Sequence, residues 1–463
     1  MLPNVRCRLF FCMAQFLLYF CASESFENKH KMILNKLKAG LFVWLLGFSL
    51  PLFAQTSPRQ VSFTLAEAQE YAVEHNRTLA NASIDIQKAQ ATKWQTIASM
   101  LPQVSASSSY SNSLGYKMDL GPMKISMTPY MTFNLSTAIG LSGAQIVSLG
   151  IADISRRMAD ITLEKTEKQI ADQVETLYFS ALVTEETIRL LNENLKSMRK
   201  LHDITQNSVD VGVAEQTDAD QLQVQVATME STIKTTQRSL EMILNSLRLQ
   251  LCLDDDVEIV LTQGIDDLLN MGTTSDLLAT EFDINNNYDY KLLKESTELA
   301  RKQIALTGWS NGPTVSVYHQ YNARHNFSDE ATMNMTPPNM LGAQLNIPLF
   351  TFGKSYAAVK DAKLAYKKQL NTLEDTELAL NVQYRQLLYN LRSAIEKYEI
   401  QKQNVAVAKR VFDNIAKKYE FGVASSLDVT NSGTNLISAQ NSYVQSLLEI
   451  VNAQISLEQL LNK

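Results

Sequence analysis

The sequence contains few of the residues that interrupt regular structure. Its 463 residues include only 16 glycines and 10 prolines, so few and long elements are expected. Charged residues make up 19%, with 42 Lys and Arg against 48 Asp and Glu. The resulting net charge of −6 argues against a nucleic-acid partner, which would require a basic surface. The 45% hydrophobic content excludes intrinsic disorder and collagen.

Cysteines and long apolar segments are equally scarce. Three of the four cysteines lie before residue 55, which leaves Cys252 without a partner for an intramolecular disulfide in the rest of the chain. We expect Cys252 to be an inert packing residue. Beyond Ala54 no run of 18 apolar residues occurs. A membrane-spanning part after Ala54 would therefore have to consist of β-strands.

The first 54 residues contain the pattern of a secretory signal peptide. A lysine-containing n-region is followed by the apolar run 41–53 and by Ala54, a small residue suited to cleavage. We therefore predict a signal peptide at 32–54. Translation is expected to start at Met32, with residues 1–31 being an upstream extension.

A duplicated motif divides the remainder of the chain. Gly212-Val-Ala-Glu-Gln-Thr-Asp218 returns 210 residues later as Gly422-Val-Ala-Ser-Ser-Leu-Asp428. Such a period indicates two copies of one unit. Repeat 1 is predicted at 60–252, with strands at 102–113 and 129–146 and a helical hairpin with its tip near 212. A linker follows at 253–290, with a strand-like segment at 257–261. Repeat 2 is predicted at 291–463, with strands at 313–323 and 339–350 and a hairpin tip near 422.

Apolar residues recur every seven positions on both sides of the second motif. They are Tyr384, Leu391, Tyr398, Val405 and Phe412 before it, and Val429, Leu436, Tyr443, Ile450 and Leu457 after it. Sustained heptads predict coiled-coil packing. The segments from Gly150 to Gly212 and from Gly353 to Gly422 would each be about 90–100 Å long as helices. Such lengths favour a tube over a compact domain.

The predicted strands alternate apolar residues with small or polar ones. The mainly apolar rows are Met131, Phe133, Leu135, Thr137, Ile139 and Leu141 in one strand, and Leu341, Ala343, Leu345 and Ile347 in another. Their lack of charge on either face is typical of transmembrane β-strands, although two half-buried hairpins of a soluble sheet would alternate too. Four strands cannot close a barrel. Two copies would give eight strands and a filled bore, and three would give twelve and a channel, with 112–128 and 323–337 as its external loops.

Together these features resemble the TolC-like outer membrane efflux family of Gram-negative bacteria. The resemblance covers 60–463. It is carried by Phe63-Thr-Leu-Ala-Glu-Ala-Gln-Glu-Tyr-Ala-Val-Glu-His-Asn76, Leu101-Pro102, Pro348-Leu-Phe-Thr-Phe-Gly353 and the paired Gly-x5-Asp motifs. The order, duplication and spacing of these motifs make the match specific.

The resemblance implies a mixed α and β membrane protein that assembles as a homotrimer. Each protomer would give four strands to a 12-stranded β-barrel in outer-membrane lipid, and long coiled-coil helices to a periplasmic α-barrel. The implied function is that of a passive exit duct in a tripartite efflux or type I secretion system. Its implied partners are a periplasmic adaptor (membrane fusion) protein and an inner-membrane transporter, which would deliver small molecules such as drugs and toxins.

The resemblance also places the periplasmic aperture at the two Gly-x5-Asp turns. By position, Asp218 and Asp428 match the acidic residues and Tyr419 the tyrosine that hold such an aperture closed. The glycines of the turns are Gly212 and Gly422. The sequence departs at Ala424, where some members have arginine, and at Asn431, where they have aspartate. Taken without the resemblance, the two aspartates are also typical helix caps, a role compatible with acidic rings around a bore.

The sequence contains no recognisable catalytic constellation. Its five histidines lack metal-ligand spacing, and phosphate-binding, dinucleotide-binding and nucleophile-elbow motifs are absent. We therefore expect neither an enzyme nor a cofactor. The alternative to an exit duct is a periplasmic coiled-coil structural protein without a pore, which would leave the four uncharged strands without a purpose.

Overall fold

The structure is a computed structural model that describes residues 59–462, except for 120, 122–123, 266–275 and 328–335. The predicted upstream extension (1–31) and signal peptide (32–54) lie outside the described residues. Both stay predictions. Among the described residues, no helix is both long enough and apolar enough to cross a membrane.

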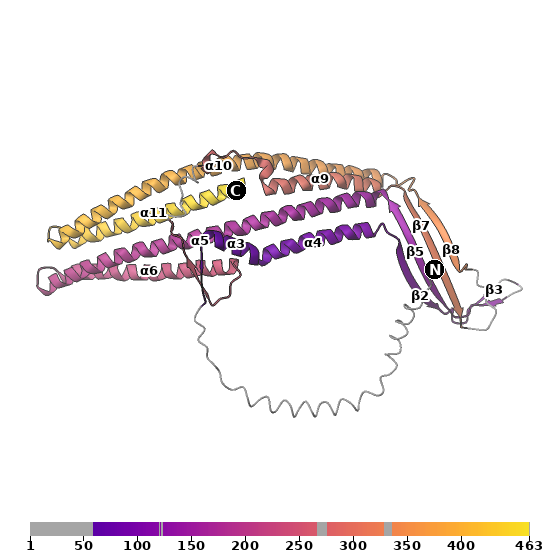
Figure 1. Ribbon diagram of the computed structural model, residues 1–463, viewed down its shortest axis with the longest axis horizontal. Helices are drawn as coiled ribbons and strands as arrows, with labels where there is room; N and C mark the ends of the chain where they lie inside the picture. Colours follow the sequence, from indigo (N-terminus) through magenta and orange to yellow (C-terminus); the bar gives the residue numbers. More distant parts are fainter. Residues whose placement is uncertain (1–58, 120, 122–123, 266–275, 328–335, 463) are drawn as a thin grey trace, which may run out of the picture. The chain divides into compact units, whose positions relative to one another are not determined.

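Both halves of the described chain follow one order of elements (Figure 1). Helices lead into strands, and strands lead into a very long helix, a short turn and a second long helix. The first half comprises β1 (Arg59–Phe63), α3 (Leu65–His75), α4 (Arg77–Ala98), β2 (Gln103–Ser111), β3 (Lys117–Asp119), β4 (Lys124–Ser126), β5 (Tyr130–Ser142), α5 (Gly143–Asp210) and α6 (Gln216–Gln250). The second comprises β6 (Val257–Leu261), η1 (Ile284–Asn286), α9 (Tyr288–Trp309), β7 (Thr314–Asn326), β8 (Asn339–Asn346), α10 (Lys354–Glu420) and α11 (Ser426–Leu461).

Four strands form an antiparallel sheet in the order β2-β5-β7-β8. The central pair joins the two halves of the chain, with Tyr130 opposite Asn326 at one end and Ser142 opposite Thr314 at the other. Strands β2 and β8 each have a single partner in this sheet, so each leaves one edge unpaired. Separate two-stranded sheets are formed by β1 with β6 and by β3 with β4.

The two faces of the four-stranded sheet differ in chemistry. On one face, hydroxyl groups pair between β2 and β5: Ser105 Oγ lies 2.7 Å from Ser136 Oγ, and Ser109 Oγ lies 2.7 Å from Thr132 Oγ1. The other face carries exposed apolar side chains, namely Val104, Met131, Phe133, Leu135, Leu141, Val315, Val317, Leu341 and Leu345. The predicted alternation is therefore confirmed. His319, which interrupts the apolar row, lies opposite Thr137 of β5 and Leu341 of β8.

Several predicted strand limits were wrong. Strand β5 ends at Ser142 instead of 146, because Ser142 caps α5 in a capping box with Gln145. Strand β8 ends at Asn346 instead of 350, just before Pro348, which has no N–H group to extend the ladder. Strand β7 continues to Asn326 instead of 323, because β5 pairs with it over its whole length.

Smaller differences affect the linker and a loop. Strand β6 coincides with the strand-like segment expected at 257–261. Helix α9 starts at Tyr288, before the expected limit at 291, because Asn287 caps it. The segment 112–128 is more than a loop, since it contains the β3–β4 pair.

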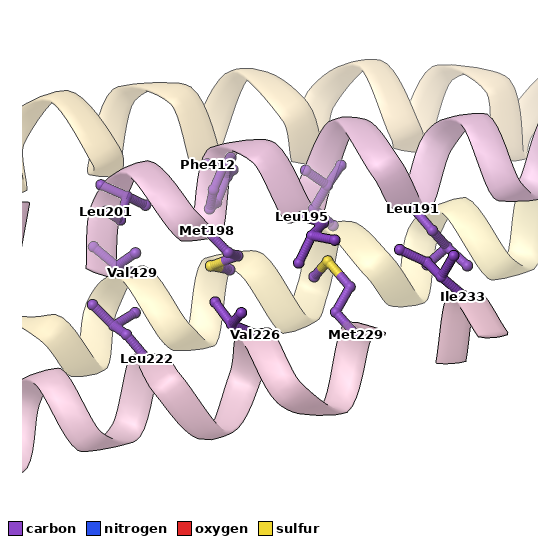
Figure 2. Packing of buried hydrophobic residues seen from close by; sticks show 11 residues of the cluster. Leu191, Leu195, Met198, Leu201, Leu222, Val226, Met229, Ile233, Phe412 and Val429 are labelled. Atoms are coloured by element: carbon purple, nitrogen blue, oxygen red, sulfur yellow. The ribbon is translucent and has the colours of Figure 1, made fainter. Parts of the chain in front are cut away.

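Buried apolar residues join all four long helices near the turns (Figure 2). The cluster consists of Leu191, Leu195, Met198 and Leu201 of α5, Leu222, Val226, Met229 and Ile233 of α6, Phe412 of α10, and Val429 and Leu436 of α11. Contact is close at Gly433, where an added Cβ would lie 2.1 Å from Met198 Cε. The absence of a side chain at Gly433 thus allows α11 to approach α5 closely.

The heptad positions form the core as predicted. Leu391, Val429, Ile450 and Leu457 are fully buried. Helices α5 and α10 contain 68 and 67 residues, which corresponds to about 100 Å each. The hydrophobic seam between them and their shorter partners stabilises helices of this length, since propensity alone stabilises a helix only weakly.

Candidate aperture at the helical turns

The two Gly-x5-Asp turns have the same backbone geometry. Gly212 and Gly422 adopt φ of 71° and 72°, in the left-handed region that favours glycine. In each turn the next residue closes the helix end: Val213 N donates to Ser208 O and Val423 N donates to Lys418 O, both at 2.8 Å. These Schellman-type bonds explain why the helices stop there.

Asp428 has the capping role expected from the sequence, although at the third helical position. Ser425 N donates to Asp428 Oδ2 at 3.0 Å, and Asp428 N donates to Ser425 Oγ at 3.2 Å. This reciprocal pair is a capping box at the start of α11. The hydrogen bond from the Ser425 backbone lowers the pKa of the Asp428 carboxyl, so it is anionic at neutral pH.

Asp218 does not cap its helix, so that prediction was wrong. The N-cap of α6 is Glu215, whose side chain makes no capping bond. Ser426 of the other turn donates a hydrogen bond to Asp218 Oδ1 instead. The carboxylate therefore joins the two turns, because the packing of α6 beside α11 brings a hydroxyl donor within reach.

Tyr419 connects the ends of α10 and α5. Its hydroxyl oxygen lies 2.6 Å from Oγ1 of Thr205, a fully buried residue. Thr205 Oγ1 donates its only proton to Leu201 O at 2.8 Å, so Tyr419 is the donor in the pair. Tyr419 thus bonds to a buried threonine and not to either aspartate.

Two exposed ion pairs lie near the same end of the helices. Lys200 Nζ lies 2.7 Å from Glu420 Oε1, and Arg199 Nη2 lies 2.5 Å from Glu230 Oε1. Exposed pairs of this kind contribute little stability. At the turns, the two hairpins are linked by the hydrogen bonds Ser426–Asp218 and Tyr419–Thr205. Farther along the helices, the buried amide of Asn194 in α5 donates to Gln440 Oε1 in α11.

The duplicated hairpins, the paired turns and the four-stranded sheet agree with a sequence-family match. The profile described as "Outer membrane efflux protein" matches residues 69–251 and 285–463. The chain belongs to the outer membrane efflux protein family. It is an exit duct of the outer membrane that extends into the periplasm, and the family is one of transport ducts, not of enzymes.

Individual relatives are distant but match over most of their length. The "Outer membrane protein TolC" of Vibrio cholerae is 21% identical over 424 residues, which cover 87% of this chain and 94% of that protein. The "Probable efflux pump outer membrane protein TtgC" of Pseudomonas putida is 21% identical over 83% of this chain and 79% of that protein. The solved structure of VceC from Vibrio cholerae has a TM-score of 0.70 at 15% identity, covering 86% of this chain and 95% of that one. The TolC-like resemblance is confirmed.

Two asparagines of this efflux protein each cap one helix and donate a hydrogen bond to the end of another, a role that was not predicted from the sequence. Asn76 caps α4 and donates from Nδ2 to Gln250 O, at the end of α6, at 3.1 Å. Asn287 caps α9 and donates from Nδ2 to Leu460 O, at the end of α11, at 3.3 Å. An asparagine before a helix is a cap signal in the sequence. Its second bond depends on a helix about 170 residues away, which local pattern does not reveal.

A group of carboxyls lies partly buried where α5 passes α3 and α11. Burial, together with the charge of Glu458, raises the pKa of Glu175 to about 7. Burial also raises the pKa of Glu458 and of Asp172. Lys168 offsets part of this cost, with Nζ 2.8 Å from Asp172 Oδ1. The group lies outside the turns and forms no metal site: no cluster of His, Cys, Asp or Glu suited to a metal occurs among the described residues.

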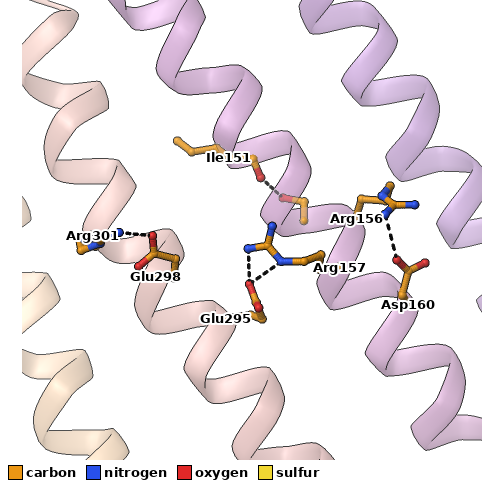
Figure 3. Close-up of polar contacts among 8 residues, drawn as sticks. Ile151, Arg156, Arg157, Asp160, Glu295, Glu298 and Arg301 are labelled. Atoms are coloured by element: carbon orange, nitrogen blue, oxygen red, sulfur yellow. Dashed lines mark hydrogen bonds and ion pairs between the residues drawn. The ribbon is translucent and has the colours of Figure 1, made fainter.

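Closer to the sheet, the ion pair between Arg157 and Glu295 links α5 to α9 (Figure 3). Arg157 donates to Glu295 Oε2 from Nη2 at 2.7 Å and from Nε at 3.2 Å.

Cys252, expected to be an inert packing residue, is a partly exposed free cysteine with φ of 54° just after the end of α6. It ends the helix with the same type of bond as the glycines, through Leu253 N to Arg248 O at 3.0 Å.

Proposed function

We propose that three copies of this chain form one duct, in which a twelve-stranded β-barrel is continued by an α-barrel of long helices in the periplasm. The unpaired edges of β2 and β8 carry this proposal. Backbone N–H and C=O groups at a sheet edge are not tolerated in lipid. Another copy satisfies them when β8 of one protomer pairs with β2 of the next.

The number of copies follows from barrel size. Two copies would give eight strands, and side chains fill a bore of that width, whereas twelve strands leave room for a channel. The hydroxyl- and amide-bearing face of the sheet, including Ser105, Ser136 and Gln320, would line the bore. The apolar face would contact outer-membrane lipid.

A passive duct depends on partners for energy and cargo. We assign these roles to a periplasmic adaptor protein and an inner-membrane transporter, with small molecules such as drugs and toxins as cargo. The printed name of the Pseudomonas putida relative, an efflux pump outer membrane protein, supports small-molecule efflux over protein secretion. The carboxylates of Asp218 and Asp428, with Tyr419, would hold the resting aperture narrow until the partners engage it.

Planar-bilayer recording of the purified protein tests the duct. We expect ion conductance, heat-modifiable trimers in detergent extracts of outer membranes, and a larger conductance for the double variant Asp218→Ala/Asp428→Ala. A protein that is soluble without detergent and gives no conductance would instead be a periplasmic coiled-coil protein. Unchanged conductance and ion selectivity in the double variant would leave the two aspartates with structural roles only.

A further inference from the structure

One permanently charged residue stands in the four-stranded sheet. Strands β2, β5, β7 and β8 contain no Lys, Asp or Glu, and their single arginine is Arg324 of β7. The strand register places Arg324 opposite Thr132 of β5. Because side chains alternate between the two faces of a strand, Arg324 lies on the same face as Gln320 and Asn322. Arg324 therefore belongs to the polar face, not to the apolar face on which His325 lies.

The side chain of Arg324 is held in place by two neighbours. Its Cζ lies 3.8 Å from the centroid of the Tyr130 ring, and its Nε donates to Asn326 Oδ1 at 2.9 Å. Stacking on an aromatic ring fixes the plane of a guanidinium group while leaving its outer N–H groups free to donate. Among the described residues, Arg324 takes part in no ion pair. Its charge is thus available to a solute.

Its position along the strand is near the end farther from the helices. Helix α5 follows directly from Ser142, at the opposite end of β5 from Tyr130. The next residues after β7 enter the segment that connects β7 to β8, one of the two predicted external loops. A solute that has passed the helices would meet Arg324 near the outer end of the polar face, with only the row of Tyr130 and Asn326 beyond it.

We infer that Arg324 forms an anion-binding ring at the outer mouth of the duct, taking carboxylate-bearing solutes as they leave. The inference rests on the proposed function, because the ring requires several copies around one bore. A planar guanidinium can bind both oxygens of a carboxylate at once. The other residues on this face of the four strands are uncharged, so the ring supplies the only fixed charge that the strands place there.

The test compares wild-type protein with Arg324→Gln in planar bilayers under a potassium chloride gradient. We expect the chloride-to-potassium permeability ratio to fall about two-fold in the variant, since one positive charge per protomer is removed from the wall of the bore. The adjacent variant His325→Gln, on the opposite face, is the matched control and should keep the wild-type ratio. The loops beyond the strands contain Lys117, Asp119, Lys124, Asp329 and Glu330 in all variants, so their charges do not enter the comparison.

Benzoate supplies the second measurement. Added on the side of the external loops, it should reduce the conductance of wild type more than that of Arg324→Gln, with Arg324→Lys between them because lysine keeps the charge but not the bidentate geometry. Equal permeability ratios and equal benzoate effects in a conducting wild type and Arg324→Gln would overturn the inference while leaving the duct intact. Absence of conductance in wild type would remove both the duct and the ring.

Discussion

The hydroxyl of Ser426 donates a hydrogen bond to Asp218 Oδ1, so the first turn of α11 is tied to the first turn of α6. These residues come from corresponding turns of the two repeats, yet their interaction is not symmetric. Asp428, the counterpart of Asp218, bonds to Ser425 in its own turn. One aspartate therefore closes a contact between repeats, and the other stabilises a helix start.

Ser426→Ala should loosen the turns without disturbing the helices. The variant removes one hydrogen bond to a carboxylate, a loss of about 1–3 kcal/mol in a partly buried site. We expect more frequent openings in single-channel recordings. Ser442→Ala is the control, because that hydroxyl bonds only within its own helix, to Ser438 O at 3.0 Å. Identical open probabilities for the two variants would contradict the proposed role of the bond.

Asn287→Ala should destabilise the fold, because it removes both the cap of α9 and the bond to Leu460 O. The expected loss is about 1–3 kcal/mol. Asn287→Asp separates the two roles, since it keeps the capping oxygen but lacks the amide donor. We expect its midpoint of unfolding in detergent to lie between those of wild type and Asn287→Ala. If Asn287→Asp unfolds like wild type, the bond between α9 and α11 contributes nothing.

The raised pKa of Glu175 predicts a pH dependence of stability. Between about 4.5 and about 7 the folded protein holds a proton that the unfolded chain has released. Stability therefore falls as the pH rises through this window, by at most about 1–3 kcal/mol from this residue. Glu175→Gln should raise the unfolding midpoint at pH 8 and change it little at pH 4. A stabilisation of equal size at both pH values would show that the effect is not due to ionisation.

Gly422→Ala should cost stability through the backbone alone. An added Cβ at Gly422 would meet no atom within 4 Å, but the φ of 72° is unfavourable for alanine. We expect a loss of about 1 kcal/mol, and a smaller one for Gly422→Asn, since asparagine tolerates this region better. Comparison of unfolding midpoints tests this. Equal midpoints for wild type and Gly422→Ala would mean that the turn can change conformation freely.

Much of the fold could be predicted from local pattern. Heptads at positions such as Leu391 and Leu457 indicated the buried seam, because helical periodicity places those side chains on one face. Alternation along β5 indicated its two faces, and the repeated glycines indicated both turns. The end of β5 was placed too late, because the capping box of Ser142 with Gln145 already starts α5 at Gly143.

The candidate site was less predictable. The sequence placed Asp218 and Asp428 at helix starts, which is equally compatible with capping and with contacts between helices. Tyr419 was assigned to the aperture, and its buried partner Thr205 was not foreseen, since the two lie 214 positions apart. No role was predicted for Arg324 from the sequence, because the Tyr130 ring on which it stacks belongs to another strand.

By itself, the sequence determined the repeat, the length of the helices, the uncharged strands and the family. Each of these depends on residues that are close along the chain, where periodicity, turn residues and caps act locally. Only the tertiary structure decided which side chains meet: Ser426 with Asp218, Tyr419 with Thr205, Asn287 with Leu460 and Arg324 with Tyr130. Such pairs form because helix packing and strand register bring distant segments within about 3–4 Å, a geometry that hydrogen bonding and stacking require.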